Sequence, residues 1–151
     1  MRVVIDTNQL VASLVRPPEL ATFLMAWESA RFTVIASADL LDEYRHVLAY
    51  PDIAELIYPE LLRMYQSHLA DDIEVVDTPD VPSICRDPDD DKVIATAIYG
   101  LADFVLTVDL DLLTPDVIEV LGEVGIRILS ADTLLHLLDT FPKVDWVSYS
   151  Q

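Results

Sequence analysis

The chain has 151 residues, of which 52% are apolar and 24% charged, and its 27 acidic and 9 basic side chains give a formal net charge of −18. This length predicts one domain that buries about 70% of the surface its unfolded chain exposes, enough for a core without disulfides, and the single Cys85 excludes an intramolecular disulfide in any case. The acidity excludes a basic nucleic-acid-binding face and leaves three interpretations open: polyanion binding through divalent cations, a basic partner, and plain solubility or adaptation to high salt.

The first half of the chain alternates between the strand and helix patterns. In order, it predicts a buried strand over 2–5, a helix over 20–30, a strand over 32–36, a helix capped by Ser37, an amphipathic helix opened by Pro59, and a strand over 73–76. The helix after Ser37 is indicated by apolar residues at the spacing of one helical face: Leu40, Leu41, Tyr44, Val47 and Leu48.

The second half continues this alternation after a polar loop over 77–90. It predicts a helix whose apolar face runs from Val93 to Leu101, a strand over 104–107, a short helix opened by Thr114 and Pro115, a strand over 126–129, and a last helix capped by Ser130 that runs through Leu138. Strands that alternate with helices are typical of an α/β fold whose mostly parallel sheet is covered on both faces. In such sheets the functional crevice lies beyond the carboxyl ends of the strands.

The sequence predicts no export signal and no membrane span. Asp6 interrupts the N-terminus before the apolar core of about 7 to 15 residues that a signal peptide needs. The longest uncharged stretches, such as 93–102, fall short of the roughly 18 apolar residues of a membrane helix. We therefore expect a soluble, cytoplasmic protein whose chain begins at Met1.

Acidic residues gather at the expected carboxyl edge of the sheet. Asp6 follows the first strand, Asp109 follows the strand over 104–107, the run 87–91 (DPDDD) precedes a helix, and Glu43 lies on the second turn of the helix after the second strand. Carboxylates a few ångströms apart repel one another, and a hard divalent cation removes that cost. A set of acids without a His or Cys partner selects Mg²⁺ or Mn²⁺ over zinc.

Each acidic group also has a purely structural interpretation, which stays open at this point. Residues 6–8 could cap a helix beginning near Gln9, and the run 87–91 could be charges favoured by the helix dipole. Glu43 could be an exposed helical acid paired with Arg45 or with nothing, and Asp109 and Asp111 could be turn residues. The occurrence of acids after two separate strands, at the edge where sites form, favours a functional site.

Several other chemistries are excluded. Counted from Asp87, an EF-hand loop would need glycine where Lys92 stands and glutamate where Ile98 stands. The sequence has no phosphate-binding glycine loop and no Gly-x-Ser-x-Gly motif. Three scattered histidines (His46, His68 and His136) and Cys85, which has no adjacent base, are expected to be ordinary core or surface residues.

Four segments, in this order, carry a resemblance to a known family: MRVVIDTNQLVASLV, VIASADLLDEYRHVL, DPDDDKVIATA and ADFVLTVDLDLL. They are similar to the PIN domain, in particular to the toxin components of bacterial and archaeal toxin–antitoxin pairs (VapC-like toxins). The resemblance runs from Met1 to about Leu138 and excludes the tail WVSYSQ. It implies a nuclease domain over 1–139 and a C-terminal tail over 140–151.

The resemblance implies a three-layer α/β/α fold with a five-stranded, mostly parallel sheet, and a metal-dependent ribonuclease. It places the four catalytic acids at Asp6, Glu43, Asp91 and Asp109. Asp6, Asp91 and Asp109 would bind Mg²⁺ or Mn²⁺ directly, and Glu43 would act through water. Additional candidates are the hydroxyls of Thr7 and Thr107, the neighbouring acids Asp87, Asp89, Asp90 and Asp111, and Asp42 as a weaker choice for the second acid; Gln9 stands where the family commonly has an apolar residue.

The expected function is hydrolysis of RNA phosphodiester bonds, in the toxin of a toxin–antitoxin pair. The expected partners are an RNA substrate and a small antitoxin whose basic segment covers the acidic edge, with a homodimer as a further expectation and no membrane. One alternative is a non-catalytic acidic binding module on the same fold. Another is a phosphatase with Asp6 as nucleophile, a chemistry that usually needs a second aspartate where Asn8 stands.

Overall fold

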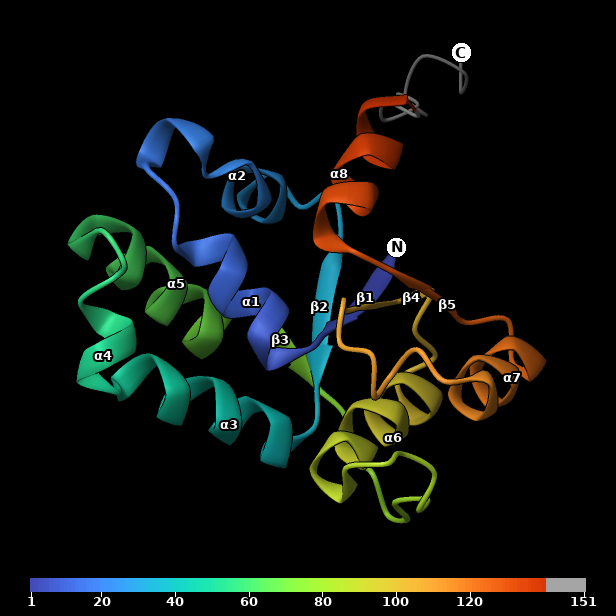
Figure 1. Cartoon of the computed structure of the whole chain (residues 1–151). Helices are drawn as coiled ribbons and strands as arrows, with labels where there is room; N and C mark the ends of the chain where they lie inside the picture. The colour runs from blue at the N-terminus through green and yellow to red at the C-terminus, as the bar shows by residue number, and fades with distance from the viewer. Residues whose placement is uncertain (141–151) are drawn as a thin grey trace.

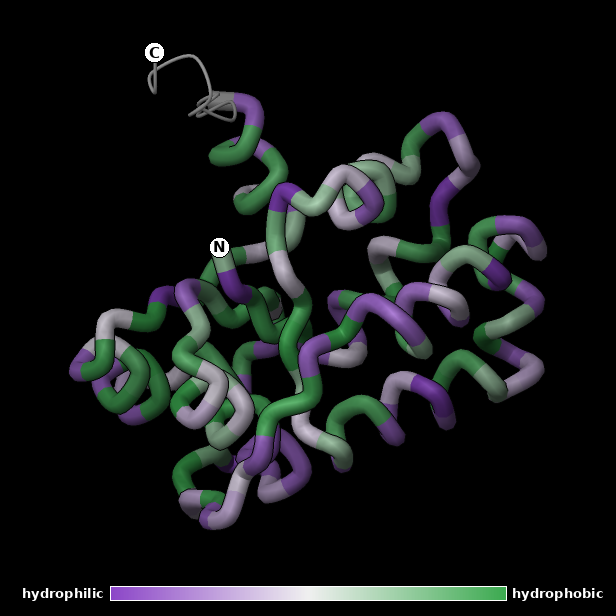
Figure 2. The backbone as a smooth tube through the Cα atoms, turned by 180° about the vertical axis from the view of Figure 1, so that it is seen from behind, coloured by the Kyte–Doolittle hydropathy of each residue, from purple (hydrophilic) through white to green (hydrophobic). Residues whose placement is uncertain are grey.

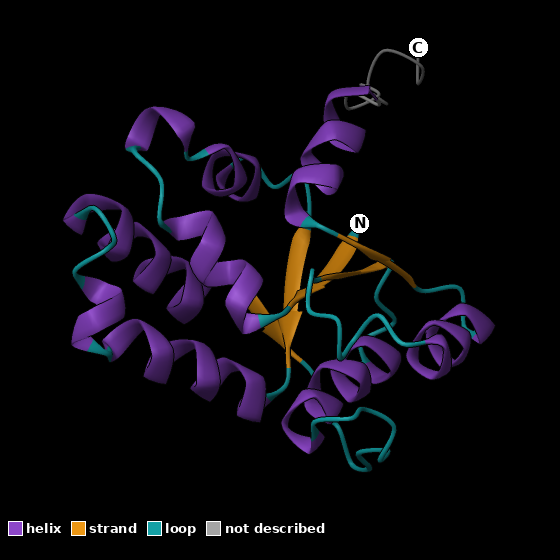
Figure 3. Cartoon of the chain, in the orientation of Figure 1, coloured by secondary structure: helices purple, strands orange, loops and turns teal. Residues whose placement is uncertain are grey.

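Five strands form one all-parallel sheet in the computed structural model of the chain, which describes residues 1–140 (Figures 1 and 3). The strand order is β3–β2–β1–β4–β5. The strands are β1 (Arg2–Ile5), β2 (Thr33–Ala36), β3 (Ile73–Val75), β4 (Phe104–Leu106) and β5 (Arg127–Leu129). The predicted α/β class and five-stranded parallel sheet are therefore confirmed.

Helices cover both faces of this sheet. They are α1 (Thr7–Leu14), α2 (Thr22–Glu28), α3 (Ala38–Ala49), α4 (Pro51–Ala54), α5 (Pro59–Asp71), α6 (Asp91–Tyr99), α7 (Pro115–Glu123) and α8 (Ala131–Thr140), with short 3₁₀ turns η1 (Pro18–Leu20) and η2 (Pro88–Asp90). Right-handed crossovers between parallel strands put α1 to α5 on one face, because the chain moves from β1 outward to β3 (Figure 1). They put α6 and α7 on the other face, because the chain then moves in the opposite direction, from β3 to β4 and on to β5.

The central strand β1 lies between β2 and β4 and is enclosed by both helical layers. Val3, Val4 and Ile5 are fully buried, as a continuous apolar run in a parallel sheet predicts. Hydrophobic and hydrophilic residues are mixed along the helices (Figure 2), and the longer helices bury apolar residues in the core. None of the helices between residues 1 and 140 has the length and hydropathy that crossing a bilayer requires.

Three predicted helix caps are present. The hydroxyl oxygen of Ser37 accepts a hydrogen bond from the amide of Leu40 at 3.2 Å, that of Thr114 from Val117 at 3.4 Å, and that of Ser130 from Thr133 at 3.0 Å. These side chains satisfy amides that a helix leaves without an internal partner. The starts of α3, α7 and α8 are therefore set by local sequence.

One helix was predicted only as an alternative, beginning near Gln9, and another was not predicted. α1 begins at Thr7, directly after the first strand, and α4 is a single turn opened by Pro51. The predicted helix over 20–30 is shorter in the structure, because residues 18–20 form η1 and α2 runs from Thr22 to Glu28. The predicted tail over 140–151 lies, beyond residue 140, outside the described residues.

Candidate metal centre

Asp6 stands at the carboxyl end of β1 and is 5% exposed. It occupies the N-cap position of α1, but its side chain makes no capping hydrogen bond. Instead, its Oδ2 accepts a hydrogen bond from the hydroxyl of Thr107 at 3.0 Å. The interpretation of residues 6–8 as a simple helix cap is therefore wrong for the Asp6 carboxylate, which the end of the neighbouring strand β4 holds in place.

Thr107 connects the ends of β1 and β4. Its hydroxyl oxygen accepts from the amide of Asp109 at 3.0 Å while the hydroxyl donates to Asp6. The Oδ1 of Asp109 in turn accepts from the amide of Asp111 at 2.9 Å. These bonds turn the chain after β4 so that Asp109 and Asp111 lie at the carboxyl edge of the sheet.

Asp90, Asp109 and Asp111 form an acidic group at this edge. One carboxylate oxygen from each lies within 4.8 Å of the other two, and all three residues are half-buried. The Oδ2 of Asp90 is buried and has no hydrogen-bond partner among the described residues. An unpaired buried carboxylate oxygen is costly, and a cation bound among these three oxygens would satisfy it.

The pKa shifts of Asp90 and Asp6 link Asp6 to this acidic group. Burial raises the pKa of Asp90 to about 7, with further increases from the charges of Asp109, Asp6, Asp87 and Asp111. Burial also raises the pKa of Asp6, where the charges of Asp109 and Glu43 add to it and the bond from Thr107 opposes it. The charges of Asp109 and Asp6 both act on Asp90, so these three carboxylates lie close enough together to interact.

Asp91 has different contacts from Asp90. It is 5% exposed, and its Oδ1 accepts from the backbone amides of Cys85 at 2.8 Å and Ile84 at 3.0 Å. Burial alone would raise its pKa, but these hydrogen bonds outweigh burial and hold the pKa below its usual value. Asp91 thus anchors the loop before α6, and its role as a direct metal ligand stays a prediction.

The other acids of this run are exposed. The Oδ1 of Asp87 accepts from the amide of Asp89 at 3.0 Å and caps η2, and both residues face solvent. Their neighbour Cys85 is not a reactive thiol, because burial and the nearby carboxylates raise its pKa to about 12.

Glu43 is bound from two sides. Its Oε1 pairs with Lys92 Nζ at 2.9 Å, and its Oε2 accepts a hydrogen bond from the hydroxyl of Thr7. The interpretation of Glu43 as a surface acid paired with Arg45 is wrong, since Arg45 pairs with Asp42 at 3.9 Å on the exposed face of α3. Thr7 follows Asp6 directly, so Glu43 lies beside the acidic edge.

Sequence reasoning missed the roles of Lys92 and Tyr44. Tyr44 is fully buried and its hydroxyl donates to the backbone oxygen of Ile5, which ties α3 to the end of β1 next to Glu43. Burial, with the charges of Asp6 and Glu43, raises its pKa well above the usual value. A tyrosine on the apolar face of the helix that carries Glu43 was the available signal, because a buried hydroxyl needs a partner.

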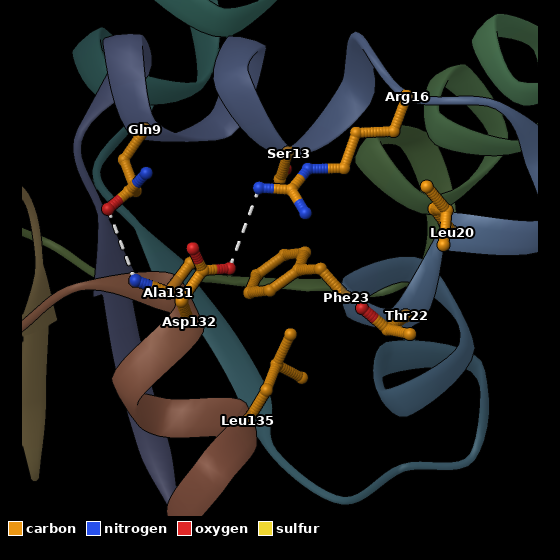
Figure 4. Close-up of a pocket in the computed structure, with 9 residues that line it drawn as sticks. All are labelled: Gln9, Ser13, Arg16, Leu20, Thr22, Phe23, Ala131, Asp132 and Leu135. Carbon is orange, nitrogen blue, oxygen red and sulfur yellow. Dashed lines mark hydrogen bonds and ion pairs between the residues drawn. The ribbon is translucent and has the colours of Figure 1, made fainter.

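Gln9 has a structural role in a small pocket between α1 and α8 (Figure 4). Its Oε1 accepts from the amide of Ala131 at 3.1 Å, and Arg16 pairs with Asp132 at 3.6 Å across the pocket. This pocket encloses about 20 Å³, room for about one water molecule. None of the candidate acids lines it, so the carboxyl edge remains the candidate centre.

A family model described as PIN domain matches residues 2–111. The chain belongs to the PIN domain family. The matched region contains all of the candidate acids, from Asp6 to Asp111. PIN domains are usually nucleases that use a divalent metal ion, and the acidic group of this PIN domain has the oxygen ligands to hold one. No curated protein and no solved structure shows a significant match to the chain.

Proposed function

We propose that this PIN domain is an endoribonuclease that depends on Mg²⁺ or Mn²⁺ and hydrolyses RNA phosphodiester bonds. The observation that carries the proposal is the group of Asp90, Asp109 and Asp111, whose carboxylate oxygens lie within 4.8 Å of one another at the carboxyl edge of the sheet. The buried, unpartnered Oδ2 of Asp90 supports the presence of a cation there. Asp6 lies in the same electrostatic field.

The residues that would hold the metal are all oxygen donors. Asp6 and Asp109 are the ligands that the family resemblance predicts at the ends of two adjacent strands. For the third ligand the resemblance predicts Asp91, whereas the contacts of Asp91 with two backbone amides support Asp90. A bound Mg²⁺ or Mn²⁺ would lower the pKa of a water molecule bound to it and would stabilise negative charge on the phosphate.

The neighbouring side chains set the geometry of this centre. Thr107 orients Asp6 through its hydroxyl, and the amide of Asp111 orients Asp109. Glu43 is held by Thr7 and Lys92. A carboxylate has about four lone-pair sites, so Glu43 keeps acceptor sites with which it orients the attacking water.

We further propose that the protein is the toxin of a toxin–antitoxin pair. The net charge of −18 and the acidic edge support a small antitoxin with a basic segment as its partner. A homodimer is proposed on the resemblance alone. Growth arrest on expression, relieved by co-expression of a small basic protein encoded beside it, tests the toxin role separately from the chemistry.

Substitution of single acids tests the nuclease. We expect Asp6→Asn and Asp109→Asn each to abolish metal-dependent RNA cleavage by the purified protein while leaving the circular dichroism spectrum unchanged, because each removes a charged ligand without changing shape. Asp80→Asn, at an exposed position of the loop before η2, is the matched control and is expected to cleave as the wild type does.

Cleavage by Asp6→Asn or Asp109→Asn within a few-fold of the wild type would refute the assignment of the centre. Wild-type protein that binds Mn²⁺ but leaves RNA intact would instead indicate a non-catalytic acidic binding module.

A further inference from the structure

Lys92 places a positive charge beside the acidic edge. It lies on the first turn of α6, its side chain is 24% exposed, and its Nζ is 2.9 Å from Glu43 Oε1. The other Lys or Arg ion pairs described within residues 1–140, those of Arg2, Arg16 and Arg45, involve Glu74, Asp132 and Asp42. Lys92 is thus the cation that pairs with an acid of the candidate centre.

The ammonium of Lys92 keeps unused hydrogen-bond donors. It has three N–H groups, and the ion pair that its Nζ makes within residues 1–140 is with Glu43. Two donors are left for solvent or for a ligand. An ammonium is a compact point charge that binds phosphate oxygens well.

Residues on two sides connect Lys92 to the centre. Asp90 and Asp91 directly precede it; Asp90 belongs to the acidic group, and Asp91 is tied to the amides of the preceding loop. On the other side, Glu43 is held by Thr7, the residue after Asp6. Lys92 therefore follows the acidic group's Asp90 by two positions and pairs with the Glu43 carboxylate.

A phosphate diester needs a positive charge at such a site. Asp6, Asp90, Asp109, Asp111 and Glu43 together carry more negative charge than one divalent cation neutralises, and this surplus repels a polyanion. Lys92 offsets part of it through its ion pair with Glu43.

We propose that Lys92 is a substrate-binding residue, whose ammonium donates to a non-bridging phosphate oxygen of the RNA strand, and that Glu43 positions this ammonium. The inference rests on the proposed ribonuclease function and assigns to Lys92 the recognition of the phosphate backbone. Recognition of this kind is independent of base sequence.

The salt dependence of RNA binding tests it. A short fluorescent single-stranded RNA is titrated with the full-length protein at 0.1 to 1 M KCl, with Ca²⁺ in place of Mn²⁺ and the RNA checked for integrity. Each phosphate contact contributes about −0.7 to the slope of log K against log salt on a single strand. We expect Lys92→Gln to reduce the slope by about 0.7 and to weaken binding about fivefold at 0.1 M salt.

Two further variants separate a phosphate contact from a structural role. Lys92→Arg keeps a cation and is expected to retain the wild-type slope. Arg127→Gln removes a positive charge from an exposed position of β5 and is expected to leave the slope unchanged. Stabilisation of Lys92→Gln by Mn²⁺ in thermal melts should remain at least as large as in the wild type, because the metal ligands are intact.

A wild-type slope in Lys92→Gln would overturn the inference while leaving the ribonuclease proposal standing. If the wild type itself neither binds nor cleaves single-stranded RNA, the proposed function fails, and this inference fails with it.

Discussion

A single carboxyl group, that of Asp90, differs from its neighbours in having a buried oxygen without a partner and a pKa raised to about 7. Near neutral pH the metal-free protein therefore holds a proton there that the unfolded chain, with an ordinary aspartate pKa near 3.9, has released. A metal ion and this proton compete for the same oxygens. Metal affinity at this centre should accordingly increase with pH through the neutral range.

The same group predicts how stability changes with pH in EDTA. The folded state binds the Asp90 proton more tightly than the unfolded state does. This proton therefore contributes its full share of the free energy of unfolding below about pH 4, and the contribution is lost as pH rises through about 7. We expect Asp90→Asn to lose less Tm between pH 5 and pH 8 than the wild type. Asp80→Asn, which removes an exposed acid, should show the wild-type decrease. An equal decrease in Asp90→Asn would contradict the environment described for this residue.

At the scale of the elements, the strands and caps could be predicted, whereas the contacts between elements could not. The run 2–5 coincides with β1, and Ser37, Thr114 and Ser130 cap their helices, because burial patterns and caps are local. The pairing of Lys92 with Glu43 depends on how the N-terminal halves of α3 and α6 meet at the sheet edge (Figure 1), which no local pattern encodes.

The candidate site shows the same division. The sequence placed acids at the carboxyl ends of two strands, and the structure brings Asp6 and Asp109 into one electrostatic field. The sequence could not distinguish Asp90 from Asp91, because both precede the same apolar helical face. Only the turn η2 decides which of the two carboxylates joins Asp109. The helix that became α1 was only an alternative in the sequence, because its start coincides with the polar residues after β1, which indicate a turn equally well.

Two glycines at helix ends test the packing, because alanine at the two positions is expected to change the free energy of unfolding in opposite directions. A Cβ at Gly100, after α6, would lie 2.4 Å from Ile35 Cδ1 and 2.7 Å from the backbone oxygen of Thr96, whereas one at Gly122, in α7, would meet nothing within 4 Å. We expect Gly100→Ala to lower the free energy of unfolding by about 1–3 kcal/mol and Gly122→Ala to raise it by about 0.5–1 kcal/mol, as measured by urea denaturation. Equal effects would show that α6 does not approach β2 as closely as described.

For the molecule as a whole, acidity is distributed in two ways. Much of the net charge of −18 is spread over the surface, where salt screens it. The acids at the carboxyl edge are different, since Asp6 is 5% exposed and Asp90 has a buried oxygen. Screening by salt and specific binding of a cation should therefore be separable in the whole protein.

Thermal melts at matched ionic strength make this separation. We expect Mn²⁺ to raise the Tm of the wild type more than NaCl does, because a ligand bound only by the folded state adds RT ln(1 + [L]/Kd) to its stability. Asp6→Asn should melt higher than the wild type in EDTA, since one repelling charge is gone, and should lose most of the Mn²⁺ response. A Mn²⁺ response that NaCl reproduces, or that Asp6→Asn retains, would mean that the edge is only an acidic surface.

The hydrogen bond from Thr107 to Asp6 joins residues 101 positions apart and has a consequence for synthesis of the chain. The first half of the centre leaves the ribosome with β1, but β4, Thr107 and Asp109 are translated much later. Until then Asp6 has no neighbour to hold its carboxylate, and the cation ligands are incomplete. A prematurely terminated chain that ends before β4 therefore carries no assembled centre, so the proposed nuclease activity requires synthesis past Asp111.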